Sequence, residues 1–278
     1  MIHSDLIFDL GFHNGDDTAY YLTRGYRVLG VDANPAVMES GHGRFEKQIA
    51  EGRLVLRNVG VAGTSSTLHF YVNEADSKLS SFDRSLAARH GDPCLEVPVP
   101  CVTLLDLFQE HGVPHYLKVD LEGYDELCAR ALIGAAELPP FVSLELFMGD
   151  DVAILEALQS AGYSRFKLIH GVSFTQSEPI FQHEKGARML RKLSRRLPGF
   201  KRILQATPSL LRPQKDEFDS FREKLDYPFP EGCTGPFAEE TPGPWRSYDA
   251  IRRKAAVLKE KLKRDPTQSL WYDVHAAR

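Results

Sequence analysis

Three carboxylate residues in this sequence stand where apolar stretches end. Asp120 and Glu122 lie at the end of the stretch 115–120 and just beyond it, and Glu145 lies near the end of the stretch 141–147. If both stretches are parallel strands, these carboxylates meet at one edge of a sheet, where the carboxyl ends of such strands form ligand sites. A carboxylate there could remove a proton from a substrate hydroxyl. Three together could also bind a hard metal ion such as Mg²⁺ or Ca²⁺.

Both chemical roles compete with structural ones. Glu122 could only cap a turn, and Asp120 could only neutralise Lys118, a lysine inside an otherwise apolar stretch. His13 is a further candidate base, although a lone histidine in a tight turn is more often structural. No H-x-x-x-H or H-E-x-x-H pattern is present, so we predict no zinc site. A divalent metal is compatible with the carboxylates but is not predicted. The candidate catalytic residues are therefore Asp120, Glu122, Glu145 and His13.

A second candidate site lies in the first 35 residues. An apolar run at 6–8 leads into a turn that contains Gly11 and Gly15, a helical segment follows, and a second apolar run at 28–31 ends on Asp32. This order predicts a strand, a glycine turn, a helix and a second strand. The glycines let the backbone approach a ligand, and the amides at the helix start can bind a polar group. An acid at the tip of the second strand is placed to bind a ribose diol.

The acids beside the glycine turn favour a cationic ligand. Asp9, Asp16 and Asp17 would repel a pyrophosphate, and the G-x-G-x-x-G pattern of dinucleotide sites is missing. S-adenosylmethionine has a sulfonium, an ammonium and a ribose with two free hydroxyls, which suits these residues. One alternative is a Rossmann-like unit without a ligand, and a less favoured one is an NAD-linked oxidoreductase.

Two blocks of the sequence resemble a known family. The segments 7–18 (IFDLGFHNGDDT) and 31–35 (VDANP) are similar to the opening motifs of the FkbM family of S-adenosylmethionine-dependent methyltransferases. The segment 116–123 (YLKVDLEG) is similar to that family's K-[IV]-D-x-E-G signature. The resemblance covers about residues 5–148. It implies a methyltransferase that uses S-adenosylmethionine and releases S-adenosylhomocysteine.

The resemblance also implies functions for particular residues. It places the small hydroxyl residue Ser81 near the bound cofactor, and it alone suggests the acceptor, a hydroxyl of a sugar, a glycan or a small natural product. The main alternative from another class is a catalytically idle domain that binds a nucleoside or a partner. With the strand ends, the resemblance predicts these cofactor-binding residues: Asp9, Gly11, Asn14, Gly15, Asp16, Thr18, Asp32, Ala33, Asn34, Val59, Gly60, Ser81 and Asp120.

The candidate residues must be positioned by secondary structure, and the sequence alternates between strand patterns and helix patterns. Strands are expected at 6–8, 28–31, 54–59, 115–120, 141–147 and 165–169, with a sheet-edge or hairpin strand at 67–72. Helices are expected at 16–22, 36–52, 125–133, 150–161 and 248–262, and another follows the N-cap Thr103 with Asp106 in a capping box. Such alternation is typical of an α/β protein with an open, mostly parallel, Rossmann-like sheet and helices on both faces.

We expect a catalytic domain at 1–172 and a C-terminal accessory segment at 173–278 that packs on it. The strongly basic stretch Lys185–Lys215 is interpreted as surface helices with a solvated face. The alternative is a lid or a patch for an anionic acceptor. The stretch 228–244 is rich in glycine, proline and aromatic residues, which predicts an ordered loop that lines the acceptor pocket. A terminal helix completes the segment.

The length and composition of the chain limit the classes of function that it can have. The chain of 278 residues is long enough for one large core with an appendage. Its formal net charge of -4 argues against a nucleic-acid partner. Four cysteines without C-x-x-C spacing predict free thiols in a reducing compartment. No leader pattern and no apolar run of membrane-spanning length are present, so a cytoplasmic location with a small-molecule acceptor is expected.

Overall fold

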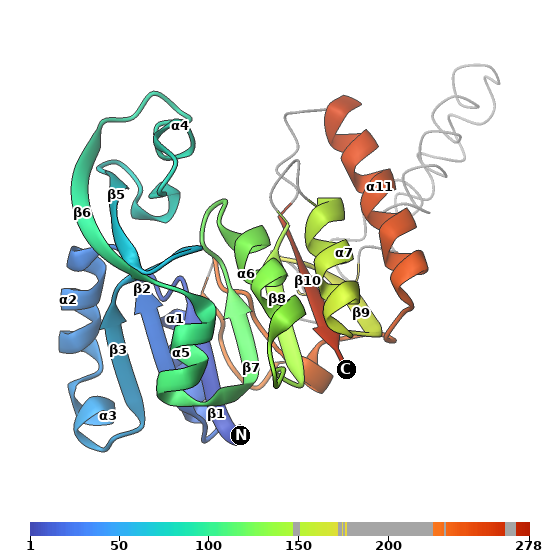
Figure 1. Ribbon diagram of the computed structural model, residues 1–278, viewed down its shortest axis with the longest axis horizontal. Coiled ribbons are helices and arrows are strands. Elements are labelled where there is room, and N and C mark those ends of the chain that lie inside the picture. The colour runs from blue at the N-terminus through green and yellow to red at the C-terminus, as the bar shows by residue number, and fades with distance from the viewer. Residues whose placement is uncertain (147–150, 172–173, 175, 177–224, 231, 265–270) are drawn as a thin grey trace, which may run out of the picture.

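The computed structural model describes residues 1–146, 151–171, 174, 176, 225–230, 232–264 and 271–278. The basic stretch Lys185–Lys215, with both of its interpretations, lies outside the described residues. A seven-stranded sheet forms the centre, in the order β3-β2-β1-β7-β8-β10-β9 (Figure 1). Its strands are β1 (Ile2–Leu10), β2 (Arg27–Asp32), β3 (Leu54–Asn58), β7 (Val113–Val119), β8 (Phe141–Glu145), β9 (Arg165–His170) and β10 (Tyr272–Ala277).

Strand directions confirm the predicted class. The pairs β1–β2, β2–β3, β1–β7 and β7–β8 are parallel, and β10 runs antiparallel to both of its neighbours, β8 and β9. The sheet is therefore an open, mostly parallel α/β sheet whose strand order reverses beside β1, where such folds form ligand sites.

The last strand corrects the sequence analysis. Residues 272–277 were assigned to an accessory segment that packs on the domain, yet β10 inserts between two core strands. Its burial explains why: Tyr272, Val274 and Ala276 join the core on one face, and Asp273 and His275 face the other. This is the period-two pattern of a strand, hidden by two buried polar residues. For the rest of the chain, the boundary at residue 172 stays a prediction.

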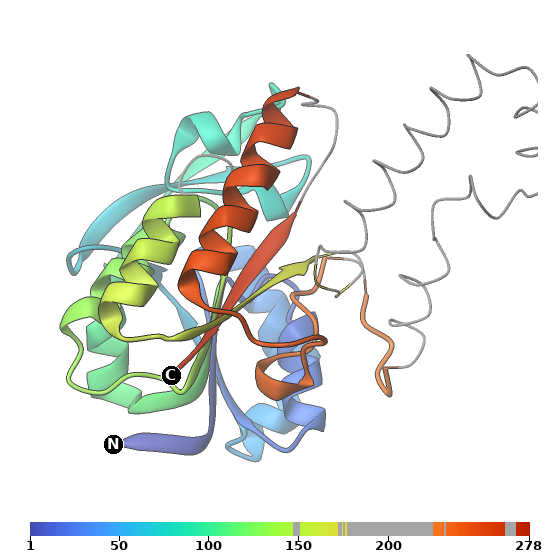
Figure 2. The same ribbon diagram turned by 90° about the vertical axis from the view of Figure 1, so that its right-hand side faces the viewer.

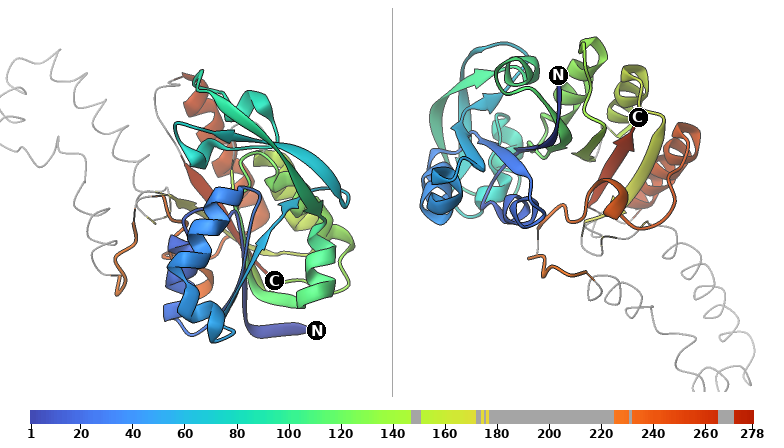
Figure 3. Two further views of the ribbon diagram at one scale, coloured as in Figure 1. Left: turned by 90° about the vertical axis from the view of Figure 1, so that its left-hand side faces the viewer. Right: turned by 90° about the horizontal axis from the view of Figure 1, so that it is seen from below.

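Helices cover both faces of the sheet (Figures 2 and 3). One face packs against α5 (Leu104–His111), α6 (Asp125–Ala131), α7 (Asp151–Ala161) and α11 (Tyr248–Arg264) in the larger apolar core. The other face packs against α1 (Asp16–Thr23), α2 (Pro35–Arg44) and the C-terminal loop segments 225–230 and 232–238. No described helix combines the length and the hydropathy that crossing a membrane requires.

Two helix predictions had different outcomes. The capping box that begins α5 is confirmed, because Thr103 accepts from the amide of Asp106 while Asp106 accepts from the amide of Thr103. The single helix expected at 36–52 is instead α2 and α3 (Glu46–Ala50), separated at Phe45. Phe45 is buried and its ring packs edge-on against Phe12, so tertiary packing ends the helix there.

A small second sheet stands at the carboxyl ends of the first strands (Figure 1). It contains β4 (Gly60–Val61), β6 (Cys94–Val102) and β5 (Ser66–Asn73), in that order. Between β5 and β6 the chain forms a 3-10 turn, η1 (Ser77–Leu79), and the short helix α4 (Arg84–Ala87). The antiparallel pair β5–β6 confirms the predicted hairpin strand and brings η1 to the edge of the ligand site.

Candidate active site

A cavity of about 430 Å³ opens at the carboxyl ends of β1, β2, β7 and β8. Several residues that the sequence analysis did not assign to a site also contribute to its wall, namely Lys78, Phe82, Tyr124 and Trp271. Asp17 beside the glycine turn and Cys233 of the stretch 228–244 line it as well. Most of the predicted residues line it: Gly11, His13, Asn14, Asp16, Asp32, Ala33, Val59, Gly60, Asp120, Glu122 and Glu145.

The glycine turn brings two strand ends into contact. Gly11 has a φ of 82°, and its amide donates to the carbonyl of Val31 at 2.9 Å. A Cβ at this position would lie 1.8 Å from the carbonyl oxygen of Asp120. Only glycine permits that approach and that backbone conformation. Gly15, with a φ of 77°, then precedes α1.

Asp32 is held in place by two backbone amides. Its Oδ2 accepts from the amide of His13 and its Oδ1 from the amide of Asn34, each at 2.8 Å. Burial raises the pKa of Asp32 to about 6, and the two amides oppose this rise. Each carboxylate oxygen keeps a second lone pair, and the residue lines the cavity. The group can therefore accept two further hydrogen bonds from a ligand diol.

His13 also lines the cavity, in a strained turn. Its φ is 47°, and its Nε2 lies 3.1 Å from the Oγ of Ser77 in η1. Burial lowers the pKa of His13, and the positive charges of Lys78 and Lys118 lower it further. The lowered pKa favours the neutral ring, which links the glycine turn to η1. Its role as a base stays a prediction.

A buried lysine organises the acids beneath the turn. Lys118 is 3% exposed, and its Nζ lies 3.0 Å from Asp9 Oδ1 and donates to the carbonyl of Gly11 at 2.9 Å. Asp17 and Asp120 each lie 3.8 Å away. Burial alone would lower the pKa of Lys118, but the three carboxylates raise it well above its usual range. The lysine is charged and is shared by three acids.

Several predicted cofactor residues support the cavity from outside its wall. Thr18 donates to Asp9 Oδ2 at 2.7 Å, so both lie beneath the turn. Asn34 caps α2, and the hydroxyl of Ser81 donates to the carbonyl of Glu122 at 2.8 Å. The predicted residues outside the wall are Asp9, Gly15, Thr18, Asn34 and Ser81.

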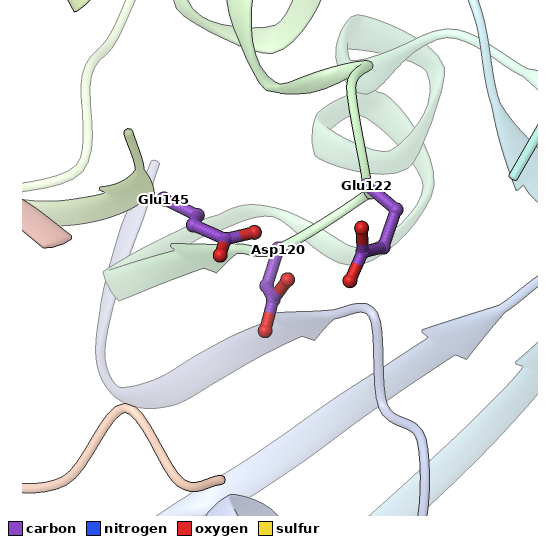
Figure 4. Close-up of side chains that lie close together, drawn as sticks. All are labelled: Asp120, Glu122 and Glu145. Carbon is purple, nitrogen blue, oxygen red and sulfur yellow. The ribbon is translucent and has the colours of Figure 1, made fainter. Parts of the chain in front are cut away.

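The three candidate catalytic carboxylates do come together. Asp120, Glu122 and Glu145 each offer an oxygen, and these oxygens all lie within 4.8 Å of one another (Figure 4). Glu122 has a φ of 48° and pairs with Arg89 at 2.9 Å. Burial and the neighbouring Asp120 raise the pKa of Glu122 to about 7, although Arg89 opposes this rise. Burial and the same neighbour raise the pKa of Glu145 well above its usual range.

The C-terminal loop closes one side of the cavity, as the stretch 228–244 predicted. Gly232 and Cys233 line the cavity wall. The amides of Thr234 and Gly235 donate to the carboxylate of Asp17 at 3.1 and 3.3 Å. Burial raises the pKa of Asp17 to about 6, although Lys118 opposes this. The sequence placed Asp17 beside the glycine turn, but no local signal pointed to these two partners, which lie more than 200 positions away.

Comparison with known proteins identifies a family. The sequence model of the methyltransferase FkbM domain matches residues 9–164. That range contains every predicted site residue and the two strand ends that carry the carboxylates. No curated protein matches the chain in sequence.

Three solved structures align with the chain at low identity. Precorrin-6y C5,15-methyltransferase from Geobacter metallireducens is 13% identical, with a TM-score of 0.34, and the alignment covers 63% of this chain and 72% of that one. A TehB-like SAM-dependent methyltransferase from Corynebacterium glutamicum is 14% identical (TM-score 0.31; 60% and 70% covered). Phosphoethanolamine N-methyltransferase 2 from Haemonchus contortus, in complex with S-adenosyl-L-methionine, is 11% identical (TM-score 0.35; 100% and 49% covered).

Proposed function

Because the chain belongs to the FkbM methyltransferase family, we propose that it transfers the methyl group of S-adenosylmethionine to a hydroxyl of a sugar, a glycan or a small natural product. The observation that carries the cofactor part is Asp32. Two backbone amides fix its carboxylate at the rim of the cavity, with lone pairs left for two ribose hydroxyls.

The charge of the cavity supports a cationic cofactor. Asp16, Asp17 and Asp120 line it together with Lys78 and Lys118, and Lys118 is already bound to Asp9 and to the carbonyl of Gly11. A ligand with a sulfonium and an ammonium gains from such a wall, whereas a pyrophosphate would be repelled. The glycine turn provides the close backbone approach for its methionine end.

The carboxylate cluster supports a hydroxyl acceptor. In the proposed reaction the acceptor oxygen attacks the methyl carbon in line, the carbon–sulfur bond breaks, and sulfur keeps the electron pair as S-adenosylhomocysteine forms. The hydroxyl proton must leave, and Asp120, Glu122 and Glu145 are the groups at hand to receive it. Most of the remaining rate enhancement then comes from holding donor and acceptor in line.

Calorimetry tests the cofactor first. S-adenosylmethionine and S-adenosylhomocysteine should both bind the wild type, and Asp32→Ala should weaken binding by about tenfold or more, the cost of losing a charged hydrogen bond. Asp106→Ala is a matched control, since Asp106 also accepts a backbone amide but does so at α5, outside the cavity wall. A wild type that binds neither compound would overturn the proposal. Release of S-adenosylhomocysteine then identifies acceptors among hydroxyl compounds.

A further inference from the structure

The carboxylates of the cluster belong to a row that crosses three strands. Val119 pairs with Leu144, so the next residues, Asp120 and Glu145, lie side by side at the ends of β7 and β8. Glu145 in turn pairs with Asp273 of the antiparallel strand β10. Directly paired residues put their side chains on the same face, about 5 Å apart at Cβ. The register therefore extends the cluster by a fourth carboxylate that sequence reasoning did not associate with it.

In two of these carboxylates one oxygen is buried without a hydrogen-bond partner among the described residues. Asp273 is 2% exposed, and its Oδ2 has no hydrogen-bond partner among the described residues. The Oε2 of Glu145 is buried in the same state. Burying an uncompensated carboxylate costs several kcal/mol. A positive charge bound at the carboxyl end of β8 would therefore be stabilised by these carboxylates.

Within the described residues, no side-chain cation neutralises these two carboxylates. Lys118 is bound by Asp9 and lies 3.8 Å from Asp120, and Arg89 pairs with Glu122. Within the described part of the chain, no ion pair reaches Glu145 or Asp273. Among the described residues, this row is balanced either by protons on the carboxyl groups or by a bound cation that replaces those protons.

We propose that Asp120, Glu122 and Glu145 bind one divalent cation of the Mg²⁺ and Ca²⁺ class at the floor of the cavity, with Asp273 behind Glu145 as a positioning residue. The geometry agrees, because oxygen ligands lie about 2.0–2.6 Å from such ions, so two ligands of one ion are at most about 5 Å apart. The three oxygens lie within 4.8 Å of one another and extend into the same space (Figure 4).

The carboxylates supply three ligand positions, and the remaining positions of the ion face the cavity that these residues line. An acceptor hydroxyl on the ion would lose its proton more readily. This use of the ion rests on the proposed function. The binding of the ion itself does not.

A titration of Mn²⁺ into the metal-free protein tests the site. Electron paramagnetic resonance detects binding as a loss of the signal of the free ion. The expected result is one Mn²⁺ per chain, displaced by Mg²⁺. Glu145→Gln should weaken binding more than about tenfold, and Asp273→Asn should weaken it about tenfold through Glu145. Glu126→Gln is the matched control, because Glu126 lies on α6 and pairs with Arg130 outside the cluster. Both glutamine variants keep the size of the side chain, and their thermal unfolding verifies the fold.

The outcomes separate the two proposals. Absence of Mn²⁺ binding at millimolar concentration, or binding that Glu145→Gln leaves unchanged, would overturn the metal site. S-adenosylmethionine affinity measured with a chelator present tests the proposed function separately, since the ribose contact of Asp32 needs no ion. Cofactor binding without Mn²⁺ binding would therefore reject only the ion, and the reverse result would reject only the cofactor.

Discussion

Replacing Lys118 tests how much the buried ion pairs of the site contribute to the stability of the protein. Its ammonium lies 3.0 Å from Asp9 and 3.8 Å from Asp17 and Asp120, in a position that is 3% exposed. Lys118→Met keeps the apolar stem but removes the shared charge. Three carboxylates then stay in the same space without a cation. Breaking a buried pair from one side costs about 3–5 kcal/mol, so the free energy of unfolding should fall by about that amount.

Urea unfolding measures this loss of unfolding free energy, and two further variants serve as comparisons. Arg27→Met removes an exposed ion pair with Asp5, whose distance is 2.7 Å, and should cost no more than about 1 kcal/mol. Lys118→Met combined with Asp9→Asn removes one charge of each sign and should cost less than Lys118→Met alone. A loss below about 1 kcal/mol for Lys118→Met, or a double variant less stable than the single one, would refute this reasoning.

Three further predictions concern the turn, the loop and the last strand. Gly11→Ala places a Cβ against the Asp120 carbonyl and should abolish S-adenosylmethionine binding in calorimetry; unchanged affinity would contradict the close approach. Asp17→Asn should speed hydrogen exchange of the Thr234 and Gly235 amides about tenfold, whereas unchanged exchange would show that Asp17 does not hold them. Burial lowers the pKa of His275 from 6.5 to about 3, so only the unfolded chain gains this proton between those values, and stability falls as pH falls. Between pH 6.5 and 5 the unfolding free energy of wild type should fall by about 1.6 kcal/mol relative to that of His275→Leu in urea unfolding, and a constant difference would contradict it.

Local patterns predicted most of the fold. The run that ends on Asp32, the capping box at Thr103 and the alternation of strands and helices each depend on nearby residues, and each is present. Strand β10 was missed because Asp273 and His275 look like surface residues until both neighbouring strands are known. The helix break at Phe45 likewise depends on a contact with Phe12, far from it in sequence.

The sequence predicted those residues of the candidate site that directly follow the end of a strand. Asp32, Asp120 and Glu145 needed only the strand boundaries and the geometry of parallel sheets. Lys118 stood out as a charge in an apolar stretch, but its shared bonds to Asp9 and Asp17 require the turn to be folded. The wall from the C-terminal loop and the link from Glu145 to Asp273 depend on pairings across most of the chain. Such pairings leave no periodic signal.

One calorimetric cycle tests the ribose contact of Asp32 most directly. S-adenosylhomocysteine and its 2′-deoxy and 3′-deoxy analogues are titrated into the wild type and into Asp32→Ala. If the carboxylate binds the diol, removing a hydroxyl weakens binding to the wild type by about tenfold or more and changes binding to the variant little. Equal losses in both proteins would show that the ribose lies elsewhere, and the proposed placement of S-adenosylmethionine would be wrong.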